Sequence, residues 1–153
     1  VIAADDLLFP NGTVITPDDK TLIVGETYAA RLTAFDKAED GSLSNRRIWA
    51  DLKENALEGP VPLPDGMCLD EEGAIWVASP STAEVIRVHE GGIISERIPV
   101  KTNAFACMLG GEDRKTLFVC TSNSSGVDPD AAFREKSGKI EIVKVDVPGV
   151  GRP

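Results

Sequence analysis

The chain has 153 residues, of which 42% are hydrophobic and 27% charged, and its formal net charge is −9. This length and this hydrophobic content suffice for one domain with a buried core, but not readily for two. The negative charge argues against nucleic acid and anionic membranes as main partners, because a polyanion repels the chain before contact. No apolar run is long enough to cross a bilayer. Small neutral or cationic molecules remain possible ligands.

One segment of the sequence occurs three times, the third time in altered form. The three copies are residues 9–24, 63–77 and 105–119. The first two copies contain Pro-Asn-Gly or Pro-Asp-Gly, pass through an acidic turn and end in a short apolar strand. The third copy has Ala106 in the place of Asn11 and Asp65. Asn11 and Asp65 are 54 residues apart and Asp65 and Ala106 are 41 apart, which brackets the usual period of a four-stranded propeller blade.

Each copy opens a unit of short strands with period-two alternation, separated by Gly or Asp turns. After the repeated segments, the further strands are expected at residues 31–36 and 46–50, at 84–88 and 93–100, and at 138–145. The sequence therefore predicts an all-β chain of three propeller blades. The expected ranges are residues 1–8 for a closing strand, 9–52 for blade one, 63–103 for blade two and 104–146 for blade three.

Three blades do not close a ring, because propellers have at least about four. The third unit lacks a fourth strand, whereas residues 1–8 lie where the fourth strand of a preceding blade would lie. An open half-ring would also expose two sheet faces and an unpaired edge. The sequence predicts that two chains assemble into a six-bladed ring, residues 1–8 of each closing the third blade of the other, or that the chain is half of a longer polypeptide.

Asn11 and Asp65 occupy the same position of the repeat. Because the innermost strands of a propeller start at one mouth of the central channel, these side chains are expected to converge on its axis. Amide and carboxylate oxygens suit calcium, magnesium or manganese and are acceptable to zinc. The alternative is that Asn-Gly and Asp-Gly form ordinary turns, since both dipeptides tolerate positive φ. Residues 26–28 either rim the same channel or form only a turn.

The sequence pattern predicts structural roles for the three cysteines and the single histidine. Cys68, Cys107 and Cys120 are odd in number and have no CxxC spacing, so we expect buried, reduced thiols in a cytoplasmic protein. His89 is expected on an exposed strand, and no Gly-x-Ser-x-Gly segment supports a serine hydrolase.

Other conspicuous residues also have structural interpretations. The acidic residues at 18–19 and 70–72 are expected in solvated hairpin turns rather than in a second metal site. Trp49 and Trp76 are expected in the core between blades. Residues 122–137 are expected to form a mobile loop, to which no role is assigned.

At the repeated segments, the chain resembles the gluconolactonase, regucalcin and luciferin-regenerating enzyme family of six-bladed propellers. The resemblance extends over essentially the whole chain and is strongest at residues 9–18, 64–78 and 105–111. It corresponds to the C-terminal half of the family, blades four to six.

The resemblance implies a site and an activity. Family members bind one divalent cation in the central channel and hydrolyse lactones or related esters. Their asparagine and aspartate ligands match Asn11 and Asp65, whereas a glutamate ligand and a substrate-side asparagine belong to the N-terminal half, which is absent here. We expect a metal-dependent hydrolase of a lactone or related ester, with Asp65 as base and calcium, before zinc, magnesium or manganese, as cation. The alternative is a non-catalytic propeller fragment that acts as an assembly or small-ligand-binding module.

Overall fold

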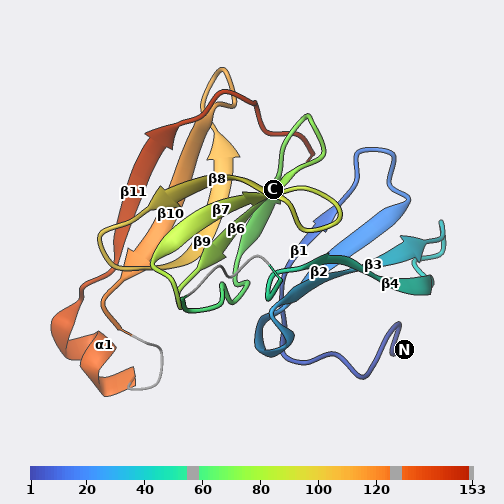
Figure 1. The fold of residues 1–153 in the computed structure, drawn as a ribbon, viewed down its shortest axis with the longest axis horizontal. Coiled ribbons are helices and arrows are strands. Elements are labelled where there is room, and N and C mark those ends of the chain that lie inside the picture. Colours follow the sequence, from blue (N-terminus) through green and yellow to red (C-terminus); the bar gives the residue numbers. More distant parts are fainter. Residues whose placement is uncertain (55–58, 125–128, 152–153) are drawn as a thin grey trace.

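The computed structural model describes residues 1–54, 59–124 and 129–151, and its strands form three antiparallel sheets (Figure 1). The first sheet contains β1 (Pro10–Ile15), β2 (Thr21–Glu26), β3 (Arg31–Lys37) and β4 (Leu43–Asp51). The second contains β5 (Met67–Leu69), β6 (Ile75–Ser79), β7 (Glu84–Val88) and β8 (Ile94–Pro99). The third contains β9 (Asn103–Gly110), β10 (Thr116–Ser122) and β11 (Lys139–Lys144). A 3₁₀ turn, η1 (Thr27–Ala29), follows β2, and α1 (Pro129–Glu135) lies between β10 and β11.

Each sheet is an up-and-down meander of consecutive strands. The orders are β1-β2-β3-β4, β5-β6-β7-β8 and β11-β10-β9, and the three sheets follow one another in chain order across Figure 1. In the described part of the chain, the first two blades have four strands and the third has three. The predicted all-β arrangement of three blades is confirmed. Blades one, two and three below denote these three sheets.

Two hydrophobic clusters hold the blades together. The first joins blade one to blade two through side chains such as Ile23, Leu32 and Trp49 on one side and Ile75 and Val77 on the other. The second joins blades two and three, and Trp76, fully buried, lies in it. Both tryptophans are therefore core residues, as predicted. Because propeller blades contact face to face, their strands carry apolar side chains on more than one face.

The segment before β1 runs along its own blade. Residues 1–9, all described, form no strand. The Leu8 N–H donates to Glu26 Oε2 at 2.8 Å, and Arg46 donates to the carbonyl oxygens of Asp5 and Asp6 at 3.1 and 2.9 Å. The expectation that residues 1–8 close blade three of a second chain concerns a partner and stays a prediction.

Three details differ from the sequence-based expectations. Cys68 and Cys107 are buried, but Cys120 is exposed, so the prediction of three buried thiols is wrong for Cys120. His89 lies in the turn after β7 and is half-buried. The loop expected at residues 122–137 contains helix α1, and its residues 125–128 lie outside the described part of the chain.

The helices among the described residues are all too short to span a bilayer.

Candidate functional site

The structure brings Asn11 and Asp65 together across the junction of blades one and two. Asn11 is the second residue of β1, and Asp65 lies two residues before β5. The Asn11 amide lies close enough to the Asp65 carboxylate to lower the pKa of that carboxyl, and its Nδ2 donates to Thr27 Oγ1 at 3.4 Å. Thr27 is buried, and its hydroxyl donates to the Pro64 carbonyl oxygen at 2.7 Å. The amide nitrogen is thereby engaged, which leaves the oxygen Oδ1 as the free end of the Asn11 side chain.

The glycines next to these residues allow the blades to approach closely. The Gly12 N–H donates to the Asp65 carbonyl oxygen at 3.1 Å, and the Gly66 N–H donates to the Phe105 carbonyl oxygen at 2.9 Å. A Cβ on Gly12 would lie 2.3 Å from the Asp65 carbonyl oxygen, and one on Gly66 would lie 2.8 Å from Ala106 Cα. Neither glycine has a positive φ. The interpretation of both dipeptides as positive-φ turns is therefore wrong, because space and not backbone conformation requires glycine here.

The Asp65 carboxylate is half-buried without a cationic partner. Its burial raises the pKa of the carboxyl above its ordinary value, and hydrogen bonds from Asn11 and from the Gly66 N–H only partly offset this effect. Among the described residues, no lysine or arginine forms an ion pair with Asp65. A partly desolvated carboxylate beside a free amide oxygen fits a hard divalent cation, which prefers oxygen ligands.

The described residues offer only part of a candidate metal site. Within the described ranges, no group of three or more His, Cys, Asp or Glu residues is placed to hold a metal ion. Ala106, at the third position of the repeat, adds no ligand. Asn11 and Asp65 would therefore offer two oxygen ligands, whereas calcium takes about six to eight oxygens in all.

The innermost strands also wall a hollow of about 750 Å³. Its lining includes Thr13 and Ile15 of β1, Leu69 of β5 and Met108 of β9, together with Arg114. Asn11 and Asp65 do not line it, because they lie at the end from which these strands start. The inner strands thus form the wall of a channel, with the candidate ligands at one end of it.

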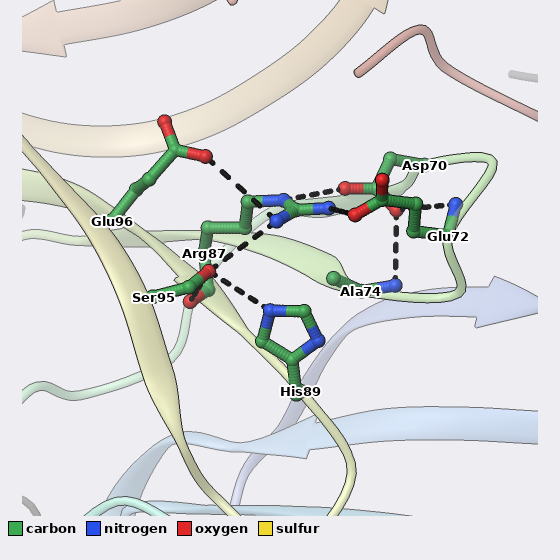
Figure 2. Close-up of polar contacts among 7 residues, drawn as sticks. All are labelled: Asp70, Glu72, Ala74, Arg87, His89, Ser95 and Glu96. Carbon is green, nitrogen blue, oxygen red and sulfur yellow. Dashed lines mark hydrogen bonds and ion pairs between the residues drawn. The ribbon is translucent and has the colours of Figure 1, made fainter. Parts of the chain in front are cut away.

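A buried ion pair in blade two was not expected from the sequence (Figure 2). Asp70, predicted in a solvated turn, is fully buried, and that prediction is wrong. Its carboxylate accepts hydrogen bonds from the backbone N–H groups of Glu72 and Ala74, both at 3.0 Å, and from Arg87 Nε at 2.7 Å. Arg87 also donates to Glu72 Oε2 at 2.8 Å. The only sequence signal for this pair is Arg87 itself, a charged residue between the apolar residues of β7.

The single histidine takes part in the same network. His89 Nε2 lies 2.9 Å from Ser95 Oγ, and Ser95 in turn contacts Arg87 (Figure 2). Ser95 is exposed on β8, in the outer hairpin of blade two. The contact between His89 and Ser95 joins the turn after β7 to β8. Among the described residues, no carboxylate is hydrogen-bonded to His89, so no acid orients its imidazole.

Glu26 is a second buried carboxylate, in a segment that the sequence predicted only as a channel rim or a turn. It lies at the end of β2 and accepts hydrogen bonds from Arg31 Nε at 2.8 Å, from Thr33 Oγ1 and from the Leu8 N–H, with Arg46 at 3.5 Å. Burial opposes ionisation of Glu26, but the hydrogen bonds from Arg31, Thr33 and Leu8 outweigh it and lower its pKa to about 2. Glu26 therefore ties the segment before β1 to blade one.

Glu26 predicts a specific loss of stability in acid. Its pKa falls from 4.5 to about 2 on folding, so between these values the folded chain binds fewer protons than the unfolded chain. The stabilisation is complete above the higher value and is lost as the pH falls through the lower one. We expect Glu26→Gln to be less stable than the wild type near neutral pH and to lose less stability on acidification, as measured by urea unfolding at a series of pH values. Glu90→Gln, at an exposed turn residue, is the control. An equal pH slope for wild type and Glu26→Gln would contradict the assignment.

Comparison with known proteins places these features in a family. The family model described as the SMP-30/Gluconolactonase/LRE-like region matches residues 1–123. The chain is 33% identical over 152 residues to regucalcin from Oryctolagus cuniculus, which covers 95% of this chain and 48% of that protein. It is 28% identical over 153 residues to a 6-deoxy-6-sulfogluconolactonase from Pseudomonas putida, covering 99% of this chain and 51% of that protein.

A solved structure shows the same fold. Regucalcin from Agrobacterium tumefaciens, described as a calcium-binding protein, matches with a TM-score of 0.74 and 23% identity over 97% of this chain and 50% of that chain. The chain spans about half the length of the curated relatives that it matches, and its three blades are half of a six-bladed propeller. The chain belongs to the SMP-30, gluconolactonase and luciferin-regenerating enzyme family.

Proposed function

We propose that the chain contributes to the site of a divalent-metal-dependent hydrolase of a lactone or a related ester. The observation that carries this proposal is the contact between Asn11 and Asp65 at the starts of β1 and β5, in neighbouring blades. The family supports a lactonase-like function, since one relative is named 6-deoxy-6-sulfogluconolactonase. The substrate is a small molecule that reaches the channel at this end.

Asn11 Oδ1 and the Asp65 carboxylate would hold one divalent cation. Calcium is the first choice, because the ligands are hard oxygens and a structural neighbour is described as calcium-binding; zinc, magnesium and manganese are the alternatives. Such a cation would supply Lewis-acid polarisation of the lactone carbonyl.

The side chains of this chain would position and activate the attacking water. Asp65 is the base that takes a proton from this water, and no covalent nucleophile is needed. Asn11 lies beside the carboxylate and favours its ionised form, and Thr27 holds Asn11 by accepting a hydrogen bond from Nδ2. Partial burial makes the Asp65 carboxylate a stronger base than an exposed one.

A metal titration tests the site. We expect Asp65→Ala and Asn11→Ala each to weaken binding of calcium, measured by calorimetry, by at least roughly tenfold. Asp18→Ala is the control, because Asp18 is an exposed aspartate in the turn between β1 and β2, at the other end of β1 from Asn11. Hydrolysis of a set of aldonolactones, assayed with and without a chelator, tests the activity. Unchanged calcium binding in Asp65→Ala would contradict the assignment.

The non-catalytic alternative has one observation in its favour. The described residues supply only two ligands, so the chain could bind a metal or a small ligand without turning over a lactone. Metal binding that depends on Asp65, without hydrolysis of any lactone in the set, would select this alternative.

The free state of the cysteines fits a protein in a reducing compartment such as the cytoplasm. All three cysteines are free, although two lie in adjacent strands of the core.

A further inference from the structure

A bulge in β1 brings Asn11 to the junction with blade two. The register of β1 against β2 shifts between Pro10 and Thr13, so that Asn11 and Gly12 together stand opposite one residue of β2. Such a bulge, with two residues against one, bends its strand and redirects the side chains on it. At this bulge the Gly12 N–H donates to the Asp65 carbonyl oxygen of blade two at 3.1 Å. The backbone of β1 is thus shaped to present Asn11 to blade two.

Thr27 lies at the same junction and contacts both blades through one hydroxyl. It belongs to η1, directly after β2, and is only 8% exposed. Its oxygen accepts a hydrogen bond from Asn11 Nδ2 at 3.4 Å, and its hydroxyl donates to the Pro64 carbonyl oxygen at 2.7 Å. Pro64 directly precedes Asp65 in the chain. Thr27 therefore connects Asn11 of blade one to the segment of blade two that carries the other candidate ligand.

The single proton of this hydroxyl decides how the Asn11 amide can face Thr27. The Pro64 carbonyl can only accept a hydrogen bond, so the short contact with it takes the hydroxyl proton. Toward Asn11 the Thr27 oxygen can then only accept, and the amide must present Nδ2, because Oδ1 would meet a second acceptor. An ionised Asp65 carboxylate beside the amide also accepts only. Both neighbours therefore select the orientation in which Oδ1 is left for a cation.

Backbone hydrogen bonds hold Thr27 itself in place. The Thr27 N–H donates to the Phe9 carbonyl oxygen at 3.1 Å, and the Thr27 carbonyl oxygen accepts from the Ala30 N–H at 3.2 Å. Phe9 has a φ of 59°, a conformation that a bulky side chain rarely adopts and that persists only where the surrounding structure enforces it. The segment that leads to Asn11 and the turn that carries Thr27 are thus fixed to each other through their main chains.

We propose that Thr27 is a positioning residue of the candidate site, whose hydroxyl sets the orientation of the Asn11 amide and keeps Oδ1 available to a divalent cation. Thr27 is not itself a ligand, because its hydroxyl is engaged by Asn11 and Pro64. The orientation of the amide is a property of the chain without metal. Its consequence for cation binding rests on the proposed function.

The side-chain amide signals of Asn11 test this orientation in the metal-free chain. Asn11→Ala identifies the signals in a heteronuclear NMR spectrum, since that variant lacks them. In the wild type, we expect the Nδ2 protons of Asn11 to exchange with water at least several-fold more slowly than those of Asn45, which is exposed and donates to Asp36. Thr27→Val keeps nearly the same shape without the hydroxyl and is expected to speed this exchange at least several-fold. Thr27→Ser keeps the hydroxyl and is expected to exchange as the wild type does.

Calcium affinity tests the consequence for the site. We expect Thr27→Val to weaken calcium binding, measured by calorimetry, by roughly ten- to a hundredfold, as the loss of a group that orients a ligand does. Thr27→Ser is expected to restore the wild-type affinity. Thr33→Val is the matched control, because Thr33 is 1% exposed in the same blade and its hydroxyl donates to Glu26, away from the candidate ligands. This control is expected to lose stability but to keep the Asn11 signals and the calcium affinity.

The outcomes separate this inference from the proposed function. Unchanged Asn11 signals in Thr27→Val, or the same changes in Thr33→Val, would overturn the inference whether or not calcium binds. Calcium binding that depends on Asp65 but not on Thr27 would also overturn it and would leave the proposed function standing. Calcium binding that Asp65→Ala leaves unchanged would contradict the metal site, whereas altered Asn11 signals in Thr27→Val would still support the orientation.

The wild type alone decides if Thr27→Val does not fold. Exchange of the Asn11 protons that is as fast as exchange of the Asn45 protons would overturn the inference, and slower exchange would support it.

Discussion

Replacement of Asp70 by alanine is expected to lower the free energy of unfolding by about 3–5 kcal/mol. The Arg87 side chain is only 6% exposed, and its other carboxylate partners, Glu72 and Glu96, are 61% and 42% exposed. Without Asp70, the guanidinium loses its buried counter-charge, and the buried N–H of Ala74 loses its acceptor. Both losses leave desolvated polar groups without compensation. Urea unfolding followed by circular dichroism at neutral pH measures the effect.

Two further variants distinguish the stabilising effect of the buried Asp70–Arg87 pair from that of an exposed ion pair. Glu72→Ala removes a largely exposed partner of the same arginine and is expected to cost about 0–1 kcal/mol. The double variant Asp70→Ala/Arg87→Met is expected to be more stable than Asp70→Ala, because it removes the charge that the single variant leaves unpaired. If Asp70→Ala cost no more than Glu72→Ala, the buried pair would not stabilise blade two as argued.

The architecture was predictable because it rests on local signals that recur. Each unit repeats a turn followed by strands with alternating apolar residues, and such alternation depends on neighbours in the sequence. The same repeat aligned Asn11 with Asp65, and equivalent positions of neighbouring blades are close in any propeller. Their contact therefore follows from the repeat, without knowledge of side-chain packing.

Asp70 could not be predicted in this way, since it looks like Asp18 in the sequence. Both aspartates stand in the turn between the first two strands of their unit, yet Asp18 is exposed and Asp70 is buried. The difference in burial between the two aspartates comes from a residue on the third strand of each blade. Arg87 pairs with Trp76 in blade two, whereas Ala34 pairs with Ile23 at the corresponding place in blade one. A buried aspartate needs this cation, and the cation is 17 residues away in the sequence.

The exposure of Cys120 escaped prediction for a similar reason. Alternation along β10 separates Phe118 and Cys120 from Leu117 and Val119, but it does not tell which of the two faces has a neighbouring blade. Both faces are apolar, so Cys120 was expected in the core. Only the arrangement of the three blades shows that the face of blade three that carries Cys120 does not pack on another of these blades.

Gly12→Ala is expected to destabilise the junction of blades one and two and to displace Asp65. The added Cβ would lie 2.3 Å from the Asp65 carbonyl oxygen and 2.9 Å from the Met67 backbone nitrogen, and neither atom belongs to a flexible side-chain end. The blades must therefore separate, which would weaken the hydrogen bond from the Gly12 N–H to Asp65. We expect a loss of about 1–3 kcal/mol or more in the free energy of unfolding, measured in urea.

Gly138→Ala provides the matched control for this variant. No atom lies within 4 Å of a Cβ built on Gly138, and this glycine has no positive φ. Its replacement is expected to change stability by no more than about 0.5 kcal/mol. Because Gly12 touches the backbone of a candidate ligand, Gly12→Ala should also weaken calcium binding under conditions in which the variant is fully folded, and Gly138→Ala should not. Wild-type stability and wild-type calcium affinity in Gly12→Ala would show that the close approach of the two blades neither stabilises the fold nor positions Asp65.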